Sequence, residues 1–374
     1  MHHSKERSSI TAAGKRLALL LLIAVGAGMA GCASSGYDRG DGLAGTVGHK
    51  VVRTYFATDR MLTHDPDPRK MFTEAGSEIS YGVCEVSIPP DHDVGRLESP
   101  SVWRLEFKEN PDRHVVLLDT WVKPKNEFYA GLANRVAQSQ GKNLLVFVHG
   151  YNVSFEDAAR RTAQMANDLN FDGAPVFYSW PSKARESLYF VDRQTLERST
   201  PRLKAFLADV FAQSNAENVY IVAHSMGNQG LTKALAELRE EDPGIKSKLK
   251  ELIIAAPDID TAVFKEQIAP GLVAAAQNIT LYASSRDVTM TLSHYFNGEY
   301  RLGDTRGGVP VIPGIETIDA SNVDTDFYAH SYVGNSKSVV MDLSALIQSH
   351  ARAAQRAKLK ATKAKGGNYW TFEP

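Results

Sequence analysis

Ser225 stands where a buried strand is expected to turn sharply into a helix. The apolar run Val219–Ala223 precedes it, and two small residues, Ala223 and Gly227, lie two positions before and after it. A sharp strand-to-helix turn has no room for bulky side chains at those positions, and it lifts the serine hydroxyl clear of the sheet. The pattern therefore predicts a nucleophilic serine that attacks acyl groups.

A second turn is expected to stabilise the negative charge that such an attack creates. The apolar run Leu144–Val148 is typical of a buried strand, and Gly150 follows it closely. Glycine lets the backbone bend so that an N–H group beyond it faces the serine. We expect the N–H groups of Met226 and Tyr151 to hold the oxyanion, with Asn152 as the alternative to Tyr151.

A serine nucleophile needs a base, and the base needs an acid that orients it. Asp287 follows the apolar run Ile279–Ala283, and His330 follows Gly314–Ile318. The carboxyl ends of parallel strands meet at one edge of a sheet, where sites of open α/β sheets form. We therefore predict a catalytic triad of Ser225, Asp287 and His330, in that chain order.

Other residues compete for the roles of acid and base. Asp258 and Asp260 follow the preceding strand, from which an acid can also reach the histidine, although we prefer Asp287 over Asp258. His294 is interpreted as a surface or core-edge histidine. His149 precedes the glycine of the second turn, and we interpret it as part of the hydrogen bonding within its own loop.

After residue 141, apolar runs alternate with segments of helical period, as a parallel sheet covered on both faces requires. The predicted strands are Leu144–Val148, Pro175–Ser179, Val219–Ala223, Leu252–Ala255, Ile279–Ala283 and Gly314–Ile318. The predicted helices run from a capping box at Ser154 and Asp157 to about Leu169, and over Thr200–Gln213, Met226–Glu240, Thr261–Ala276 and Ser336–Ala361. This order predicts a doubly wound, mostly parallel α/β sheet.

Before residue 141 the pattern is different, because short β-like runs are separated by turns that contain Pro, Asp and Gly. These runs predict N-terminal antiparallel edge strands over Val51–Ala57, Tyr81–Ile88, Val102–Phe107 and Val115–Leu118.

The first 31 residues have the order of a targeting segment. Four basic residues precede the apolar run Leu17–Ala30, which is followed by Gly31 and Cys32 and is too short to span a bilayer comfortably. The small residues before the cysteine resemble the lipobox of bacterial lipoproteins. This resemblance implies that Cys32 is lipidated and anchors the protein in the envelope of a Gram-negative bacterium, at the outer membrane or facing the periplasm. An ordinary secretory signal and an uncleaved anchor are the alternatives.

Four segments are expected along the chain. They are a signal peptide over residues 1–31, a flexible tether over 32–50, the α/β domain over 51–350 and a basic tail over 351–374. The basic residues of the tail are interpreted as the solvated end of the last helix, with contact to anionic lipid headgroups as the alternative.

The composition argues against a dedicated nucleic-acid binder, because 42 basic and 43 acidic residues give a formal net charge of −1. Two cysteines provide no disulfide framework, and Cys84 is interpreted as a small core residue. The segment Asp91–Asp93 places a histidine between two acids but has no spaced partner ligands. We interpret it as a solvated loop and predict neither a metal nor an organic cofactor.

Several segments together resemble the α/β-hydrolase superfamily, and more narrowly a bacterial family of predicted hydrolases of unknown function. The matching segments, spread over about residues 51–350, are Tyr55–Arg60, Tyr81–Gly82, Glu85–Pro89, His149–Asn152, Ser179–Ser182, Ala223–Gly227 and His330–Tyr332. The resemblance implies an α/β-hydrolase fold with Ser225, Asp287 and His330 as the triad. It implies no particular substrate.

These features predict a lipid-anchored serine hydrolase that cleaves carboxylic esters of a small molecule or a lipid. The same groups would also serve an acyltransferase, and a non-catalytic envelope binding protein is the alternative from another class. The insertions Lys183–Ser199 and Tyr295–Pro313 are expected to lie beside the site as a rim or lid. The sequence predicts no oligomeric state.

Overall fold

The computed structural model describes residues 48–373, apart from 288–289, 291–292, 295–297 and 324–335. Its strands are β1 (Lys50–Leu62), β2 (Phe72–Ile88), β3 (Leu117–Lys123), β4 (Asn143–Val148), β5 (Ala174–Ser179), β6 (Asn218–His224), β7 (Leu249–Ala255), β8 (Asn278–Ala283), β9 (Glu316–Asp319), β10 (Leu359–Ala364) and β11 (Gly367–Phe372). Its α-helices are α1 (Lys125–Gln138), α2 (Phe155–Asp168), α3 (Tyr189–Gln213), α4 (Gly227–Glu241), α5 (Ile245–Lys248), α6 (Thr261–Val263), α7 (Ala269–Ala275) and α10 (Lys337–Ser349).

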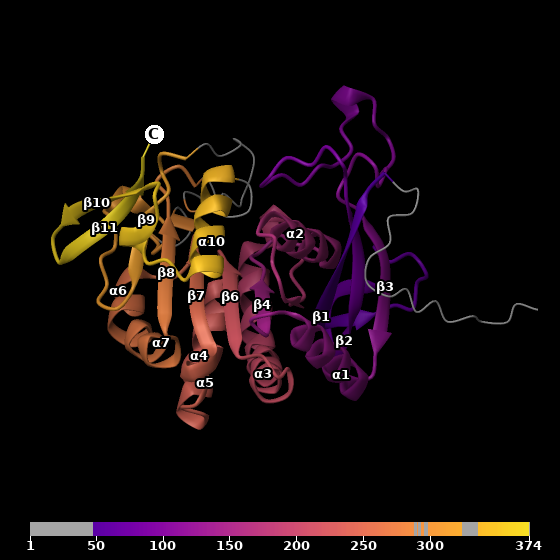
Figure 1. Cartoon of the computed structure of the whole chain (residues 1–374), viewed down its shortest axis with the longest axis horizontal. Helices are drawn as coiled ribbons and strands as arrows, with labels where there is room; N and C mark the ends of the chain where they lie inside the picture. The colour runs from indigo at the N-terminus through magenta and orange to yellow at the C-terminus, as the bar shows by residue number, and fades with distance from the viewer. Residues whose placement is uncertain (1–47, 288–289, 291–292, 295–297, 324–335, 374) are drawn as a thin grey trace, which may run out of the picture. The chain divides into compact units, whose positions relative to one another are not determined.

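The strands of the described residues form one sheet in the order β10-β11-β9-β8-β7-β6-β4-β5-β1-β2-β3 (Figure 1). From β11 to β1 all neighbours are parallel, whereas β1, β2 and β3 pair antiparallel at one edge and β10 and β11 do so at the other. The predicted mostly parallel sheet with N-terminal antiparallel edge strands is confirmed.

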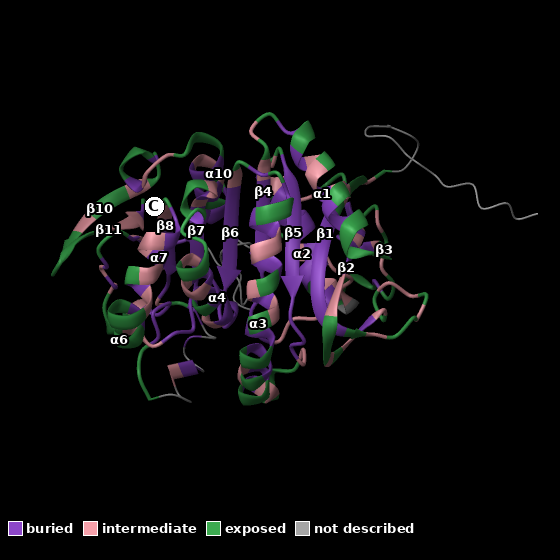
Figure 2. Ribbon diagram, turned by 90° about the horizontal axis from the view of Figure 1, so that it is seen from below, coloured by how far each residue is buried: buried purple, intermediate pink, exposed green. Residues whose placement is uncertain are grey.

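The central strands are buried on both faces because their side chains alternate between two cores. In β4, Leu144 and Val146 pack in a core with residues of α1, α3, α4 and α7. Leu145 and Phe147 point to the other face, where residues of α2 and α10 cover them. Figure 2 accordingly shows buried strands between helices whose outer surfaces are exposed. This packing holds the carboxyl ends of the parallel strands at a common edge.

The N-terminal part corrects two expectations. Val102–Phe107 is not a strand, because only a short 3₁₀ turn forms there, Leu105 has a φ of 57° and the Phe107 side chain is exposed. Helix α1 was not predicted, although its buried side chains Phe128 and Leu132 are four residues apart, as a helix facing a core requires. The capping box of Ser154 and Asp157 at the start of α2 is confirmed.

Two helix boundaries also differ from the prediction. Helix α3 begins at Tyr189 rather than Thr200 and contains Pro201 in its interior. Proline is favoured in the first turn of a helix, so it conceals a start further upstream. As a result, the second half of the insertion Lys183–Ser199 is helical. The last helix ends at Ser349 instead of continuing to Ala361.

The C-terminal residues form a β-hairpin that extends the sheet. Gly366 and Gly367, both with positive φ, lie at its turn, and β11 pairs with β9. Two arginines before the hairpin are ion-paired rather than solvated. Arg356 is buried and donates to Asp342 at 2.7 Å, and Arg352 donates to Glu251 at 3.0 Å. The interpretation of these two residues as a solvated helix end is therefore wrong.

The loop around His92 also departs from its expected solvated state. The His92 side chain is only 6% exposed, and its two ring nitrogens bond Glu98 at 2.9 Å and Asp168 at 2.7 Å. Burial alone would lower the pKa of this imidazole, but the hydrogen bonds to the two carboxylates outweigh it and raise the pKa to about 9. A protonated His92 thus ties the loop after β2 to the end of α2.

Because the pKa of His92 is higher in the folded than in the unfolded chain, this tie stabilises the fold most when the pH is below about 6.5. We expect His92→Gln to lower the free energy of unfolding by on the order of 2 kcal/mol at pH 6.5. The difference should vanish as the pH rises through about 9. Urea denaturation of both proteins across this range measures it, and a difference that grew with pH would contradict the assignment.

Candidate active site

Ser225 lies directly after β6 in the strained turn that its sequence predicts. It has a φ of 50°, a left-handed conformation that is costly for a residue other than glycine. Its N–H donates to the carbonyl of Ala255 at the end of β7 at 2.9 Å, which holds the turn. The residue is 2% exposed, and its hydroxyl makes no hydrogen bond to any residue that the structure describes. The hydroxyl is therefore available as a nucleophile.

Two glycines allow the ends of β4 and β6 to meet at this turn. A Cβ atom on Gly227 would lie 2.3 Å from the carbonyl oxygen of His149, a contact that only a backbone shift could relieve. A Cβ atom on Gly150 would lie 3.0 Å from Cβ of Ser225. The chain after β4 therefore runs directly against the predicted nucleophile, as an oxyanion-binding loop must.

The backbone N–H groups near Ser225 differ in whether they already have a hydrogen-bond acceptor. Met226 follows the serine and precedes α4, and within the described residues its N–H has no hydrogen-bond partner. The N–H of Asn152 donates to Asp192 Oδ2 at 3.2 Å. Because that group is already engaged, the geometry favours Tyr151 over Asn152 as the second donor.

Asp287 follows β8 at the same edge of the sheet. It is 8% exposed, and its Oδ1 accepts a hydrogen bond from the Met290 N–H at 3.2 Å. Burial, followed by the charges of nearby carboxylates that include Asp258 and Asp287, raises the pKa of Tyr151 to about 12. The charges of both candidate acids therefore act on the predicted oxyanion loop.

Asp258 follows β7, between the strands that carry Ser225 and Asp287, and its carboxylate is committed to other partners. Arg301 Nε donates to Oδ1 at 2.8 Å, Ser293 Oγ donates to the same oxygen at 2.5 Å, and Tyr189 donates to Oδ2 at 2.5 Å. The residue is 1% exposed. Such a saturated, buried carboxylate connects three segments of chain and has little capacity left to orient a histidine.

The histidines differ in what the structure assigns to them. His149 is buried, its Nδ1 donates to the Gly150 carbonyl at 2.7 Å and its ring stacks on Trp180, so the interpretation as a loop hydrogen-bond partner is confirmed. His294 stacks on Tyr300 with ring centroids 4.3 Å apart. The predicted base His330 lies outside the described residues, as does Cys32.

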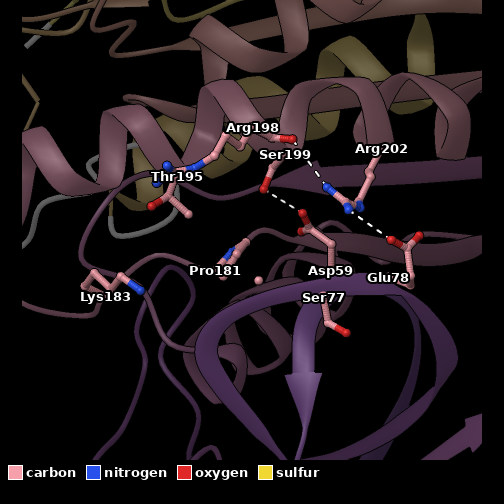
Figure 3. A pocket seen from close by; sticks show the side chains of 10 residues that line it. Asp59, Ser77, Glu78, Pro181, Lys183, Thr195, Arg198, Ser199 and Arg202 are labelled. Carbon is pink, nitrogen blue, oxygen red and sulfur yellow. Dashed lines mark hydrogen bonds and ion pairs between the residues drawn. The ribbon is translucent and has the colours of Figure 1, made fainter.

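A polar pocket of about 550 Å³ lies beside the end of β1 and does not include Ser225 (Figure 3). Asp59 at one wall accepts from Ser199 Oγ at 2.6 Å, and Arg202 pairs with Glu78 at 3.1 Å. Burial raises the pKa of Asp59. The neighbouring residue on β1, Arg60, is 1% exposed, and the sequence indicates no role for it.

Cys84 is buried, and burial raises the pKa of its thiol to about 12, as a core residue requires. Within the described part of the chain, no cluster of three His, Cys, Asp or Glu side chains is arranged to hold a metal ion. Across the same residues, no helix combines the length and hydrophobicity needed to cross a membrane.

The chain is similar to several solved structures at low identity and low TM-score. A fungal esterase from Rhizomucor miehei is 10% identical, with a TM-score of 0.34 over 80% of this chain and 84% of that one. An esterase from Pyrobaculum calidifontis is 12% identical, with a TM-score of 0.32 over 81% and 84%. An acylaminoacyl peptidase from Pyrococcus horikoshii is 10% identical, with a TM-score of 0.32 over 76% and 53%. No curated protein sequence matches the chain.

The family comparison covers the segment that carries the elbow and the predicted oxyanion loop. The family described as alpha/beta hydrolase of unknown function (DUF900) matches residues 125–350, which is more than half of the chain. This match agrees with the parallel sheet, with the strained turn at Ser225 and with the glycine contact between β4 and β6. The chain therefore belongs to this α/β-hydrolase family.

Proposed function

We propose that the protein is a serine hydrolase that cleaves carboxylic esters. In this mechanism, Ser225 Oγ attacks the ester carbonyl while His330 accepts the serine proton and Asp287 orients His330. The N–H groups of Met226 and Tyr151 stabilise the oxyanion of the tetrahedral intermediate. His330 then protonates the leaving alcohol and leaves an acyl group on Ser225. In the second half of the reaction, water attacks this acyl group while His330 accepts its proton, and His330 returns the proton to Ser225 Oγ as the acid leaves.

The observation that carries this proposal is the geometry around Ser225. A left-handed, non-glycine residue costs on the order of 1 kcal/mol or more, and such strain persists where the surrounding structure requires it. The strained turn presents a hydroxyl without a described partner, next to a loop that only glycine allows to approach so closely. A protein that used this fold only for binding would have no need of the strained serine.

Covalent labelling tests the proposal on the unmodified chain. A fluorophosphonate probe reacts with an activated serine and leaves an idle one untouched. We expect one stoichiometric adduct, which peptide mass spectrometry should locate on Ser225. A protein that stayed unlabelled would support the non-catalytic alternative. A panel of nitrophenyl esters of increasing chain length, with and without an alcohol acceptor, then separates short from long acyl groups and hydrolysis from acyl transfer.

We also propose that Cys32 anchors the enzyme in the cell envelope, on the basis of the basic, apolar and small residues that precede it. Metabolic labelling with a fatty-acid analogue should mark the wild type and should not mark Cys32→Ser. Cys84→Ser is the matched control, and it should be labelled as strongly as the wild type. Equal labelling of Cys32→Ser would contradict the proposal.

A further inference from the structure

Arg60, near the carboxyl end of β1, is a buried cation whose contacts include no carboxylate among the described residues. It is 1% exposed, and burial lowers its pKa to about 10. Its Nε donates to Ser179 Oγ at 2.8 Å, and its two terminal nitrogens donate to the carbonyls of Ser182 at 3.1 Å and Val153 at 2.8 Å. Its direct acceptors are all neutral, and the charges of nearby carboxylates, Asp59 first, offset the effect of burial only in part. A buried charge held in this way is costly, so the groups that it holds need an explanation.

The hydrogen bonds that begin at Arg60 continue to the predicted oxyanion loop. Ser179 ends β5, and its Oγ lies 3.2 Å from Nε2 of His149. The other ring nitrogen, Nδ1, lies 2.7 Å from the carbonyl oxygen of Gly150. Trp180 holds the ring in place, because it stacks on the imidazole and its Nε1 donates to the His149 carbonyl at 2.9 Å.

The direction of every bond in this chain follows from the chemistry of its members. The guanidinium only donates, so Ser179 Oγ accepts from Arg60 and has its own proton left to give. Burial and the charge of Arg60 lower the pKa of His149 to about 3, so the ring is neutral. A carbonyl only accepts, so the one ring proton is on Nδ1 and Nε2 must accept from Ser179. The chain therefore runs from Arg60 through Ser179 and His149 to the Gly150 carbonyl.

The last acceptor in this chain belongs to the same peptide unit as the predicted oxyanion donor. The Gly150 carbonyl and the Tyr151 N–H share one planar, trans peptide group, in which they point in opposite directions. Glycine offers no side chain to hold that group against rotation. Beyond it, Asn152 has a φ of 57° and its N–H is held by Asp192. A hydrogen bond on the carbonyl thus fixes the direction of the Tyr151 N–H.

We propose that Arg60, Ser179 and His149 are positioning residues that hold the Gly150–Tyr151 peptide in the orientation required for oxyanion binding. This role rests on the proposed ester hydrolysis, because the three residues would keep the oxyanion hole of that reaction formed. If the chain is broken, the peptide can rotate and present a carbonyl oxygen, which repels the developing negative charge. The substrate in its ground state carries no such charge, so its binding is not affected.

The sharpest test removes one oxygen from the middle of the chain. For Ser179→Ala we expect kcat on a nitrophenyl ester to fall about tenfold to a hundredfold, below the loss for a missing oxyanion donor, while KM stays within about twofold. A trifluoromethyl ketone, which forms a hemiketal oxyanion on the serine, should lose affinity by the same factor as kcat/KM. Ser179→Cys, which preserves volume but donates more weakly, should lie between the alanine variant and the wild type.

Thr58→Val is the matched control. Thr58 is equally buried, and its hydroxyl donates to the backbone carbonyl of Ser179 at 2.6 Å and accepts from the backbone N–H of Arg60 at 3.2 Å. It touches only backbone groups of these residues, so its loss leaves the side-chain hydrogen bonds from Arg60 to Gly150 in place. We expect this variant to lose stability but to retain kcat and ketone affinity within about twofold.

Two failures are distinguishable. A wild type that neither hydrolyses esters nor reacts with the fluorophosphonate would overturn the proposed function and this inference with it. An active wild type beside a folded Ser179→Ala of unchanged kcat and ketone affinity would overturn the inference alone. A loss in Thr58→Val as large as that in Ser179→Ala would also overturn it.

Discussion

Replacing Ser225 by alanine is expected to lower kcat for an acyl ester by roughly a millionfold, because no other group can form the acyl-enzyme. The fold should persist, since alanine removes only an oxygen whose loss breaks no hydrogen bond within the described residues. The φ of 50° is about as unfavourable for alanine as for serine, so the turn should be equally stable. End-point esterase assays with purified protein measure kcat, and thermal unfolding measures the stability of the fold.

Ser214→Ala provides the control for this substitution. Ser214 is also buried, but it lies at the C-terminal end of α3, next to the start of β6 rather than its carboxyl end. Its replacement should leave kcat within about twofold of the wild type. If Ser225→Ala retained a tenth of the wild-type kcat, the nucleophile would be another residue.

The second large effect concerns the acid. Asp287→Asn should lower kcat by about four orders of magnitude with little change in KM, because the base loses the carboxylate that sets its tautomer and balances its charge. The fold should persist, and an asparagine oxygen can still accept the hydrogen bond that the Met290 N–H donates. Kinetics on one activated ester, with circular dichroism as the folding control, test the expectation.

Asp258→Asn should produce the opposite pattern. The substitution removes the negative charge that faces Arg301, which is 9% exposed. The same carboxylate also accepts hydrogen bonds from Tyr189 and Ser293. We expect the free energy of unfolding to fall by about 3 kcal/mol, with a far smaller fall in kcat for the folded fraction. Urea denaturation measures the first quantity. If Asp258→Asn were stable but nearly inactive while Asp287→Asn remained active, the triad acid would be Asp258, one strand earlier than assigned.

The features that the sequence determined by itself are those with a local physical cause. An apolar run followed by small residues around Ser225 marks a sharp strand-to-helix turn, because steric crowding within five residues decides it. The alternation of continuous apolar runs with helical periods likewise follows from burial on two faces of a sheet. Both were predicted, and the structure contains both.

Other features depended on partners far away in the sequence. Asp258 and Asp287 both follow buried strands and look alike locally, yet only the folded chain brings Arg301 and Tyr189 to Asp258. Near the C-terminus, the Ala- and Lys-rich segment Leu359–Ala364 has a helical composition but pairs as a strand, because the glycine turn folds it against β11, which itself pairs with the edge of β9.

The same reason explains why Arg60 had no predicted role. Its acceptors lie between 93 and 122 residues away along the chain, at the end of β5 and on the loops that follow β4 and β5. Nothing in the composition near Arg60 indicates that its guanidinium is buried or that Ser179 leads from it to His149. A hydrogen-bond chain of this kind exists only when three strands lie side by side, so the tertiary structure alone decided it.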